Sequence, residues 1–280
     1  METSTLILGM PATGKSTYLA AMSYILLSSE IDTILRWSQL DEFESHLYTL
    51  QDKWLKCEKL DHTPAGLDSW VTLHMTVGLN GTPIKVQLPD FSGESIKDAI
   101  VSGFYTEELY EALGKSSGIF LFTSADSKTS DILINEMSGI MSVEPESNNG
   151  PRKQFVPGDM PEQVKAVQLL QTIVDSKSKK RKLVVMISAW DIAQSANPDI
   201  TPVKWLEDNR PLLHQYLEFN CELWESRMYG VSAQGGRLPA DKARLNILAK
   251  PSERVNLVGK NTSQFDLTDP LYWLTLPQDS

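Results

Sequence analysis

The sequence contains few cysteines, no long apolar run and a shortage of basic charge. Its 280 residues include two cysteines, Cys57 and Cys221, too far apart to suggest a disulfide framework or a metal-binding spacing. No stretch approaches the roughly 18 to 20 apolar residues that a membrane-spanning helix needs. Lys and Arg total 26 against 36 Asp and Glu, a formal net charge of −10. An acidic surface repels phosphate backbones, so general nucleic-acid binding is disfavoured, although a local basic pocket for one nucleotide is not.

The chain has the length and composition of an ordinary globular protein. Hydrophobic residues make up 41% and charged residues 22%, which is typical of a packed domain. We expect a cytoplasmic protein, because residues 5–9 already have the pattern of a strand and no basic segment of a secretory signal precedes them. We further expect one domain over residues 1–280, in which residues 127–160 are an insertion and residues 237–280 a C-terminal extension packed on the domain.

The N-terminal residues carry a phosphate-binding signature. A short apolar run over residues 5–8 precedes a glycine-containing loop, and good helix formers follow it. The loop matches the P-loop pattern G-x-x-x-x-G-K-[S/T], which requires a strand before it and a helix after it. The matching residues are Gly9, Met10, Pro11, Ala12, Thr13, Gly14, Lys15 and Ser16, and Thr17 follows them.

Each residue type in this loop has a physical role. Gly9 and Gly14 let the backbone curl so that successive N–H groups point into one concavity, where the start of the next helix adds its positive dipole end. Lys15 would reach the β- and γ-phosphates, and Ser16 would coordinate Mg²⁺. The loop predicts phosphate binding but does not by itself separate kinases, ATPases and GTPases.

Apolar strands alternate with segments of helical spacing along the rest of the chain. Residues 70–90 have the pattern of a β-hairpin, because Asn80 and Gly81 lie between two alternating stretches. This order predicts an α/β protein with a three-layer P-loop NTPase fold, whose mostly parallel sheet has one antiparallel hairpin edge strand. We predict strands within 5–9, 70–77, 84–88, 118–123, 183–187 and 228–231, and helices within 15–28, 41–60, 96–113, 162–174 and 202–225.

A second candidate phosphate-sensing element follows the hairpin. Asp90 ends a predicted strand and Gly93 comes three residues later. An aspartate at a strand end beside the P-loop strand can hold the water shell of Mg²⁺. The N–H of Gly93 would contact the γ-phosphate, and Glu94 stands where a residue that positions water would lie. This spacing predicts a loop that senses whether the γ-phosphate is present.

Two further strand ends carry residues that suit a nucleobase. Asp191 follows the strand over residues 183–187, and its carboxylate would accept hydrogen bonds from N1–H and the N2 amino group of guanine, a pairing that adenine does not offer. Ser232, Ala233 and Gln234 follow the last predicted strand and would present a backbone N–H to guanine O6. Together they favour guanine over adenine.

In the order of these elements the chain resembles the Ras-like P-loop GTPases of the translation-factor-related class, and more narrowly the bacterial double-GTPase domains of conflict and defence gene clusters. The resemblance extends over residues 4–236 and includes a threonine-bearing loop at Thr63. It implies Mg²⁺-dependent binding of GTP and GDP, slow hydrolysis and a nucleotide switch. Thr63 would close over Mg²⁺ in the triphosphate state, beside Ser16 and Asp90, and Lys15, Thr63 and Glu94 would serve catalysis.

The sequence departs from this family pattern in three places. The base-reading motif is usually N/T-K-x-D, whereas here Ser188, Ala189 and Trp190 precede Asp191. The lysine whose aliphatic stem normally covers the base is therefore missing. Trp190 is the candidate to stack on the base instead, although a tryptophan beside a buried strand is more often part of the core. Glu94 stands where many relatives have glutamine, and no arginine finger is evident, so we expect slow turnover and a protein partner that supplies the missing charge.

Two other classes of function stay open at this point. The same loop occurs in small-molecule and nucleotide kinases, although the arginines of this chain are scattered rather than clustered in a lid. A scaffold that binds nucleotide but barely hydrolyses it would also agree with Glu94 and the altered base motif. Measured turnover separates the scaffold from the GTPase, and base preference separates the kinase.

Overall fold

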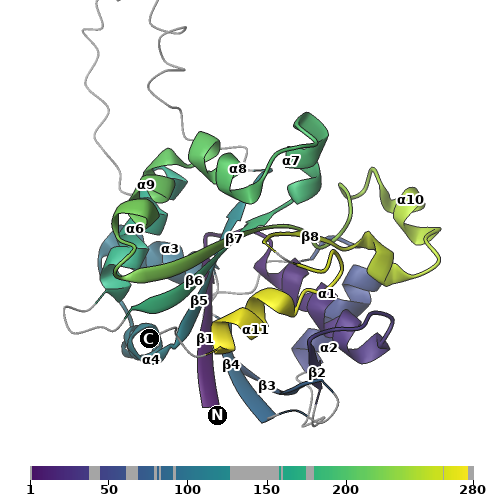
Figure 1. Cartoon of the computed structure of the whole chain (residues 1–280), viewed down its shortest axis with the longest axis horizontal. Coiled ribbons are helices and arrows are strands. Elements are labelled where there is room, and N and C mark those ends of the chain that lie inside the picture. Colours follow the sequence, from purple (N-terminus) through teal and green to yellow (C-terminus); the bar gives the residue numbers. More distant parts are fainter. Residues whose placement is uncertain are drawn as a thin grey trace, which may run out of the picture.

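The computed structural model describes residues 2–37, 45–60, 69–78, 81, 83–90, 93–126, 158, 160–174, 180–260 and 262–276 (Figure 1). One eight-stranded sheet runs through it in the order β2-β3-β4-β1-β5-β6-β7-β8. The strands are β1 (Glu2–Gly9), β2 (Leu35–Trp37), β3 (Ser69–Val77), β4 (Pro83–Asp90), β5 (Gly118–Ser124), β6 (Arg181–Ser188), β7 (Trp224–Ser232) and β8 (Asn256–Val258).

Five neighbouring strands, β4, β1, β5, β6 and β7, are parallel, so the predicted fold class is confirmed. The hairpin of β3 and β4 is also present and antiparallel. The prediction that it forms the sheet edge is wrong, because β2 pairs outside β3 and antiparallel to it. At the opposite edge β8 pairs antiparallel with β7. Both added strands are only three residues long, too short to give a period-two pattern that could be recognised in the sequence.

Helices cover both faces of the sheet, as Figure 1 shows. On one face α1, α2 and α11 pack with the side chains of Ile7 and Phe120, whereas α3, α4, α6, α8 and α9 pack on the other face with Leu6 and Ile119. Successive side chains of a strand point to opposite faces, so the central strands must be apolar throughout. The helices are α1 (Lys15–Ser28), α2 (Ser45–Leu55), α3 (Gly93–Ser102), α4 (Glu107–Lys115), α6 (Glu162–Ile173), α7 (Trp190–Ala196), α8 (Pro202–Asn209), α9 (Pro211–Phe219), α10 (Lys242–Asn246), α11 (Asp269–Thr275) and the 3-10 helix η2 (Pro251–Arg254).

Two helices predicted as continuous are each divided into two. The helix predicted within 96–113 breaks after Ser102, and Thr106 caps the start of α4 by accepting a hydrogen bond from the backbone N–H of Leu109. The helix predicted within 202–225 breaks before Pro211, because proline has no N–H and its ring clashes with the preceding turn. Apolar spacing continues through both breaks, which is why it did not reveal them.

The C-terminal segment is fastened to the sheet by buried hydrogen bonds. Asp266, 1% exposed, accepts from the backbone N–H of Ile34 at 2.8 Å and from the hydroxyl of Thr268 at 2.6 Å. The hydroxyl of Tyr18 in α1 donates to the backbone carbonyl of Leu267 at 2.6 Å. These bonds hold β2 and α1 against the segment that leads into α11. None of the helices that the structure describes is long and apolar enough to cross a bilayer.

Asp269, at the start of α11, should make stability depend on pH. Burial, reinforced by the charge of Asp266, raises the pKa of its carboxyl to about 6, while Arg227 opposes the shift. The folded state then binds a proton more tightly than the unfolded state, so this group lowers stability as pH rises from about 4 to about 6. We expect Asp269→Asn to gain stability over the native chain across this range, by on the order of 1–2 kcal/mol at pH 8 because the site is only partly buried.

Urea denaturation between pH 4 and pH 8 measures this difference in the free energy of unfolding. Asp199→Asn, the same substitution at an exposed residue, is the matched control. An advantage of Asp269→Asn that shrinks as pH rises would contradict the assignment.

Candidate nucleotide-binding site

Four loops meet at the carboxyl edge of the parallel strands. They follow β1, β5, β6 and β7, and between them lies a cavity of about 690 Å³. Residues of three predicted motifs line it, namely Ala12, Gly14, Thr17, Asp191, Ser232, Ala233 and Gln234. The structure therefore brings the predicted phosphate loop and the predicted base-reading residues into one cavity.

The loop between β1 and α1 has the backbone geometry that its glycines permit. Gly14 lies in the left-handed region at φ 88°, directly before the first turn of α1. A Cβ at Gly14 would come within 2.9 Å of the Cβ of Ser188, so this position excludes side chains on steric grounds too. Ala12 also has a positive φ, 61°, which strains a residue with a side chain. Strain of this kind collects at functional sites because the surrounding structure has to maintain it.

Lys15 is nearly buried and closes the loop on itself. Its ammonium donates to the backbone carbonyls of Gly9 at 2.7 Å and Met10 at 3.0 Å. The hydroxyl of Thr13 donates to the same Met10 carbonyl at 2.8 Å. Ser16 and Thr17 follow in the first turn of α1 and are half-buried, and Pro11 is half-buried at the start of the loop. The first N–H groups of a helix have no partner within it, so this turn can offer them to an anion.

The carboxylate of Asp191 is oriented by a neighbouring strand. The hydroxyl of Ser232, the last residue of β7, donates to Asp191 Oδ1 at 2.7 Å. A carboxylate has further lone pairs, so Asp191 can still accept hydrogen bonds from a ligand in the cavity. Ala189, two residues earlier, has φ 52°, and this left-handed residue turns the chain from β6 into α7.

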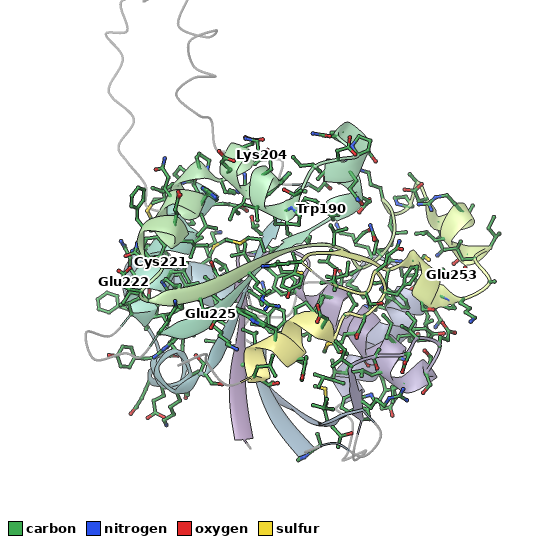
Figure 2. All side chains as sticks on the ribbon, in the orientation of Figure 1. Trp190, Lys204, Cys221, Glu222, Glu225 and Glu253 are labelled. Atoms are coloured by element: carbon green, nitrogen blue, oxygen red, sulfur yellow. The ribbon has the colours of Figure 1, made fainter. Side chains whose placement is uncertain are left out.

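Trp190 does not occupy the position predicted for it. Its side chain has 0% exposure, and it is absent from the cavity lining. Figure 2 shows it directed inward between α7 and β7, where a Cβ on Gly230 would lie 2.1 Å from its ring. The prediction that Trp190 stacks on a base is therefore wrong, because the tryptophan fills the space above a glycine of the next strand.

Of the other predicted residues, three are located only by the helix or strand that contains them, and one lies outside the described residues. Asp90 is the last residue of β4, which is parallel to β1 and ends at the same edge. Gly93 and Glu94 begin α3. Thr63 lies outside the described residues.

Three charged residues of the cavity were missed by sequence reasoning. Lys59, Asp126 and Arg237 all line it, and Arg237 Nη2 lies 3.2 Å from Asp126 Oδ1. The pair is separated by 111 positions in the sequence, so no local pattern revealed it. The only local signal was the position of Arg237, shortly after the predicted loop at Ser232, Ala233 and Gln234.

The parallel sheet, the glycine loop ahead of α1 and the aspartate turn after β6 define a P-loop protein of the GTPase class. Comparison with known proteins then identifies the family: the model of Double-GTPase 1 matches residues 6–274, and the chain belongs to this family. The predicted resemblance is confirmed, and the family match favours the GTPase class over the kinases that the loop alone left open.

One solved structure and the curated proteins complete the comparison. This chain is similar to the Ski7 GTPase-like domain of S. cerevisiae, whose crystal structure was determined with bound GTP. The two share 14% sequence identity, and the TM-score is 0.43. The match covers 84% of this chain and 44% of that chain, so this chain spans less than half of its length. No curated protein matches the sequence.

The packing of Trp190 on Gly230 predicts the behaviour of a pair of variants. Gly230→Ala should destabilise the protein by about 1–3 kcal/mol, because the new methyl group overlaps the Trp190 ring. Trp190→Leu creates space at the same point, so the double variant should lose at least about 1 kcal/mol less than the sum of the two single losses.

Urea denaturation of the native chain, the two single variants and the double variant gives the coupling free energy between positions 190 and 230. Gly114→Ala in α4 is the control, because nothing lies within 4 Å of its added Cβ, and it should be neutral or slightly stabilising. Strictly additive losses would show that Trp190 does not rest on Gly230.

Proposed function

We propose that the protein is a Mg²⁺-dependent guanine-nucleotide switch that hydrolyses GTP slowly. The observation that carries this proposal is the shared cavity, in which the P-loop and the Ser232–Asp191 pair approach each other from different strands. Its volume of about 690 Å³ is in the range of small-ligand sites. Membership of the Double-GTPase 1 family supports guanine as the base.

We propose that the phosphates lie against the P-loop. The N–H groups of residues 10–17 and the positive end of α1 would receive them, with Lys15 countering the charge that develops on the β- and γ-phosphates. The hold of Lys15 on the carbonyls of Gly9 and Met10 supports this role, because it fixes a cation at the loop before any ligand arrives. Such preorganised charge lowers the barrier without reorganisation during the reaction.

We propose that Asp191 reads the base. With Oδ1 held by the hydroxyl of Ser232, the carboxylate would accept from guanine N1–H and the N2 amino group. The loop of Ser232, Ala233 and Gln234 would present a backbone N–H to O6. Its position is supported by α2, since the indole N–H of Trp54 donates to the carbonyl of Ala233 at 2.8 Å.

The proposed metal ligands fit magnesium by their chemistry. Ser16, Asp90 and Thr63 supply hydroxyl and carboxylate oxygens, the hard donors that Mg²⁺ prefers. Among the described residues no group of three or more His, Cys, Asp or Glu could form a metal cage. This agrees with an ion held by a few side chains, phosphate oxygens and water, and when bound it would neutralise charge on the β- and γ-phosphates.

Slow turnover follows from the charge of Glu94. A carboxylate at the start of α3 repels the γ-phosphate, so it positions an attacking water less well than the neutral glutamine that many relatives have. Gly93 would sense the γ-phosphate, and its release on hydrolysis would give two states for a protein effector or activator to distinguish.

The cytoplasmic location, the role in bacterial defence and the single-domain organisation stay predictions. The last is supported by β8 and α11, which pack into the same structure as residues 2–37.

Calorimetric titration with GTP and ATP analogues in Mg²⁺ tests the assignment of the site. The native chain should prefer the guanine nucleotide by at least tenfold. Lys15→Ala should bind either nucleotide on the order of a hundredfold more weakly, because a charge-assisted contact is lost. Asp191→Ala should reduce the preference for GTP over ATP while retaining phosphate binding.

Lys204→Ala in α8 is the control, since it removes an exposed cation that pairs with Asp208 and is absent from the cavity lining. Circular dichroism would check that each variant is folded. If ATP binds tenfold better than GTP, the guanine assignment fails, and if Lys15→Ala binds like the native chain, the phosphate site itself is wrong.

Removal of Mg²⁺ should distinguish Ser16, a proposed metal ligand, from the neighbouring Thr17 by its effect on GTP binding. We expect EDTA to weaken GTP binding by the native chain at least tenfold, and Ser16→Ala to bind weakly with or without Mg²⁺ because a metal ligand is missing. Thr17→Ala, which changes a hydroxyl one residue further along α1, should keep its dependence on Mg²⁺. GTP affinity that is equal with and without EDTA would contradict the proposed metal.

A further inference from the structure

The base end of the cavity lacks the residue that usually covers a nucleobase. Ala189 stands where the family pattern has lysine, and Trp190 is buried in the core. An alanine methyl group is too small to cover a purine ring. One face of a base paired with Asp191 would therefore be exposed to water unless another side chain lies over it.

Arg237 and Asp126 approach this position from opposite sides. Asp126 follows β5 and Arg237 follows β7, while Ala189 follows β6, the strand between them. The 3.2 Å contact of Arg237 Nη2 with Asp126 Oδ1 therefore spans the end of β6. Asp126, Ala189 and Arg237 all line the same cavity as Asp191.

The loop that carries Arg237 is fixed by its own hydrogen bonds. The backbone N–H of Arg237 donates to Asp241 Oδ2 at 2.7 Å, and the N–H of Asp241 donates back to the Arg237 carbonyl at 2.7 Å. Arg244 Nη2 donates to the carbonyl of Gly235 at 2.7 Å. The side chain of Arg237 is still 63% exposed, so most of it is accessible to a ligand while Nη2 contacts Asp126.

We propose that Arg237 replaces the missing lysine and stacks its guanidinium on the nucleobase that Asp191 reads. This rests on the proposed nucleotide site. A planar guanidinium stacks on aromatic faces better than an ammonium does, and its contact with Asp126 ties one end of the guanidinium to the loop after β5. Asp126 is a positioning residue, because it would act through Arg237.

The pairing also argues for the base rather than the phosphates. Arg237 and Asp126 together carry no net charge, and the charges of Lys59 and Asp191 also cancel, so the charged side chains that line this cavity give it no net positive charge to attract a polyphosphate. Lys15 supplies a cation at the P-loop instead. Stacking is insensitive to the identity of the base because every base has a π-face, so Arg237 would add affinity and Asp191 would add specificity.

Calorimetry on the full chain in Mg²⁺, with GDP, ADP and inorganic tripolyphosphate as ligands, tests the proposal. Arg237→Ala should bind GDP and ADP about tenfold more weakly, leave the GDP/ADP ratio within threefold of native and leave tripolyphosphate binding unchanged. The loss should persist in 1 M NaCl, where a charge–charge contact would be screened. Arg237→Lys should recover part of the affinity, and Asp126→Asn should lose about threefold.

Two further variants distinguish a failure of this proposal from a failure of the nucleotide site itself. Lys204→Ala, whose exposed side chain is labelled in Figure 2, should bind all three ligands like the native chain. Lys15→Ala reports on the proposed function: if it binds GDP like the native chain, the nucleotide site fails. If binding depends on Lys15 but Arg237→Ala binds GDP like the native chain, only the role of Arg237 is overturned. A loss shared with tripolyphosphate, or abolished by salt, would assign Arg237 to the phosphates and also overturn the proposal.

Discussion

Parallel pairing of β1, β5, β6 and β7 obliges these strands to end at one edge of the sheet, and the candidate site depends on that constraint. The register pairs Ser124 with Ser188, and Ser188 with Val231, so the loops that follow start level with one another. A slip of one residue would exchange the two apolar sets of side chains on β6 between the helix layers, where their sizes and shapes would no longer fit. Burial on both faces therefore fixes the register, and the register brings together residues far apart in the sequence.

Much of the architecture could be predicted because the signals are local. The helix predicted over residues 15–28 is observed as Lys15–Ser28, since a glycine loop marks its start and the helix formers end there. The buried strands were recognisable as short apolar runs. The break between α8 and α9 also has a local signal, Pro211, which starts the new helix, but the apolar spacing continues through it and does not show the break. The edge strands β2 and β8 depend on partners distant in the sequence, so their own residues carry little signal.

The candidate site likewise contains residues that the sequence could identify and residues that it could not. Motif residues such as Gly14 and Asp191 could be found because their chemistry depends on neighbours in the sequence. Trp190 was misassigned because the sequence does not show that Gly230, on the next strand, leaves space for its ring. Asp126 and Arg237 follow β5 and β7, and Lys59 follows α2, so only the tertiary structure makes them neighbours and local patterns could not identify them. A site of this kind is built from sequence-local backbone geometry and from side chains that the tertiary structure brings to it.

Charge is distributed unevenly in this cavity, and the distribution gives the site a direction. The protein carries a net charge of −10, so it repels polyanions at long range and must bind them by local features. Lys15 lies at the loop before α1, where helix N–H groups also gather, whereas the lining of the cavity combines the carboxylates of Asp126 and Asp191 with the cations of Lys59 and Arg237. A ligand with a negative tail and a hydrogen-bond-donating head is favoured in one orientation and disfavoured in the reverse. In the proposed site guanine, which offers N–H groups to a carboxylate, would satisfy that polarity, and the neutral Arg237–Asp126 pair would add a stacking surface without disturbing it.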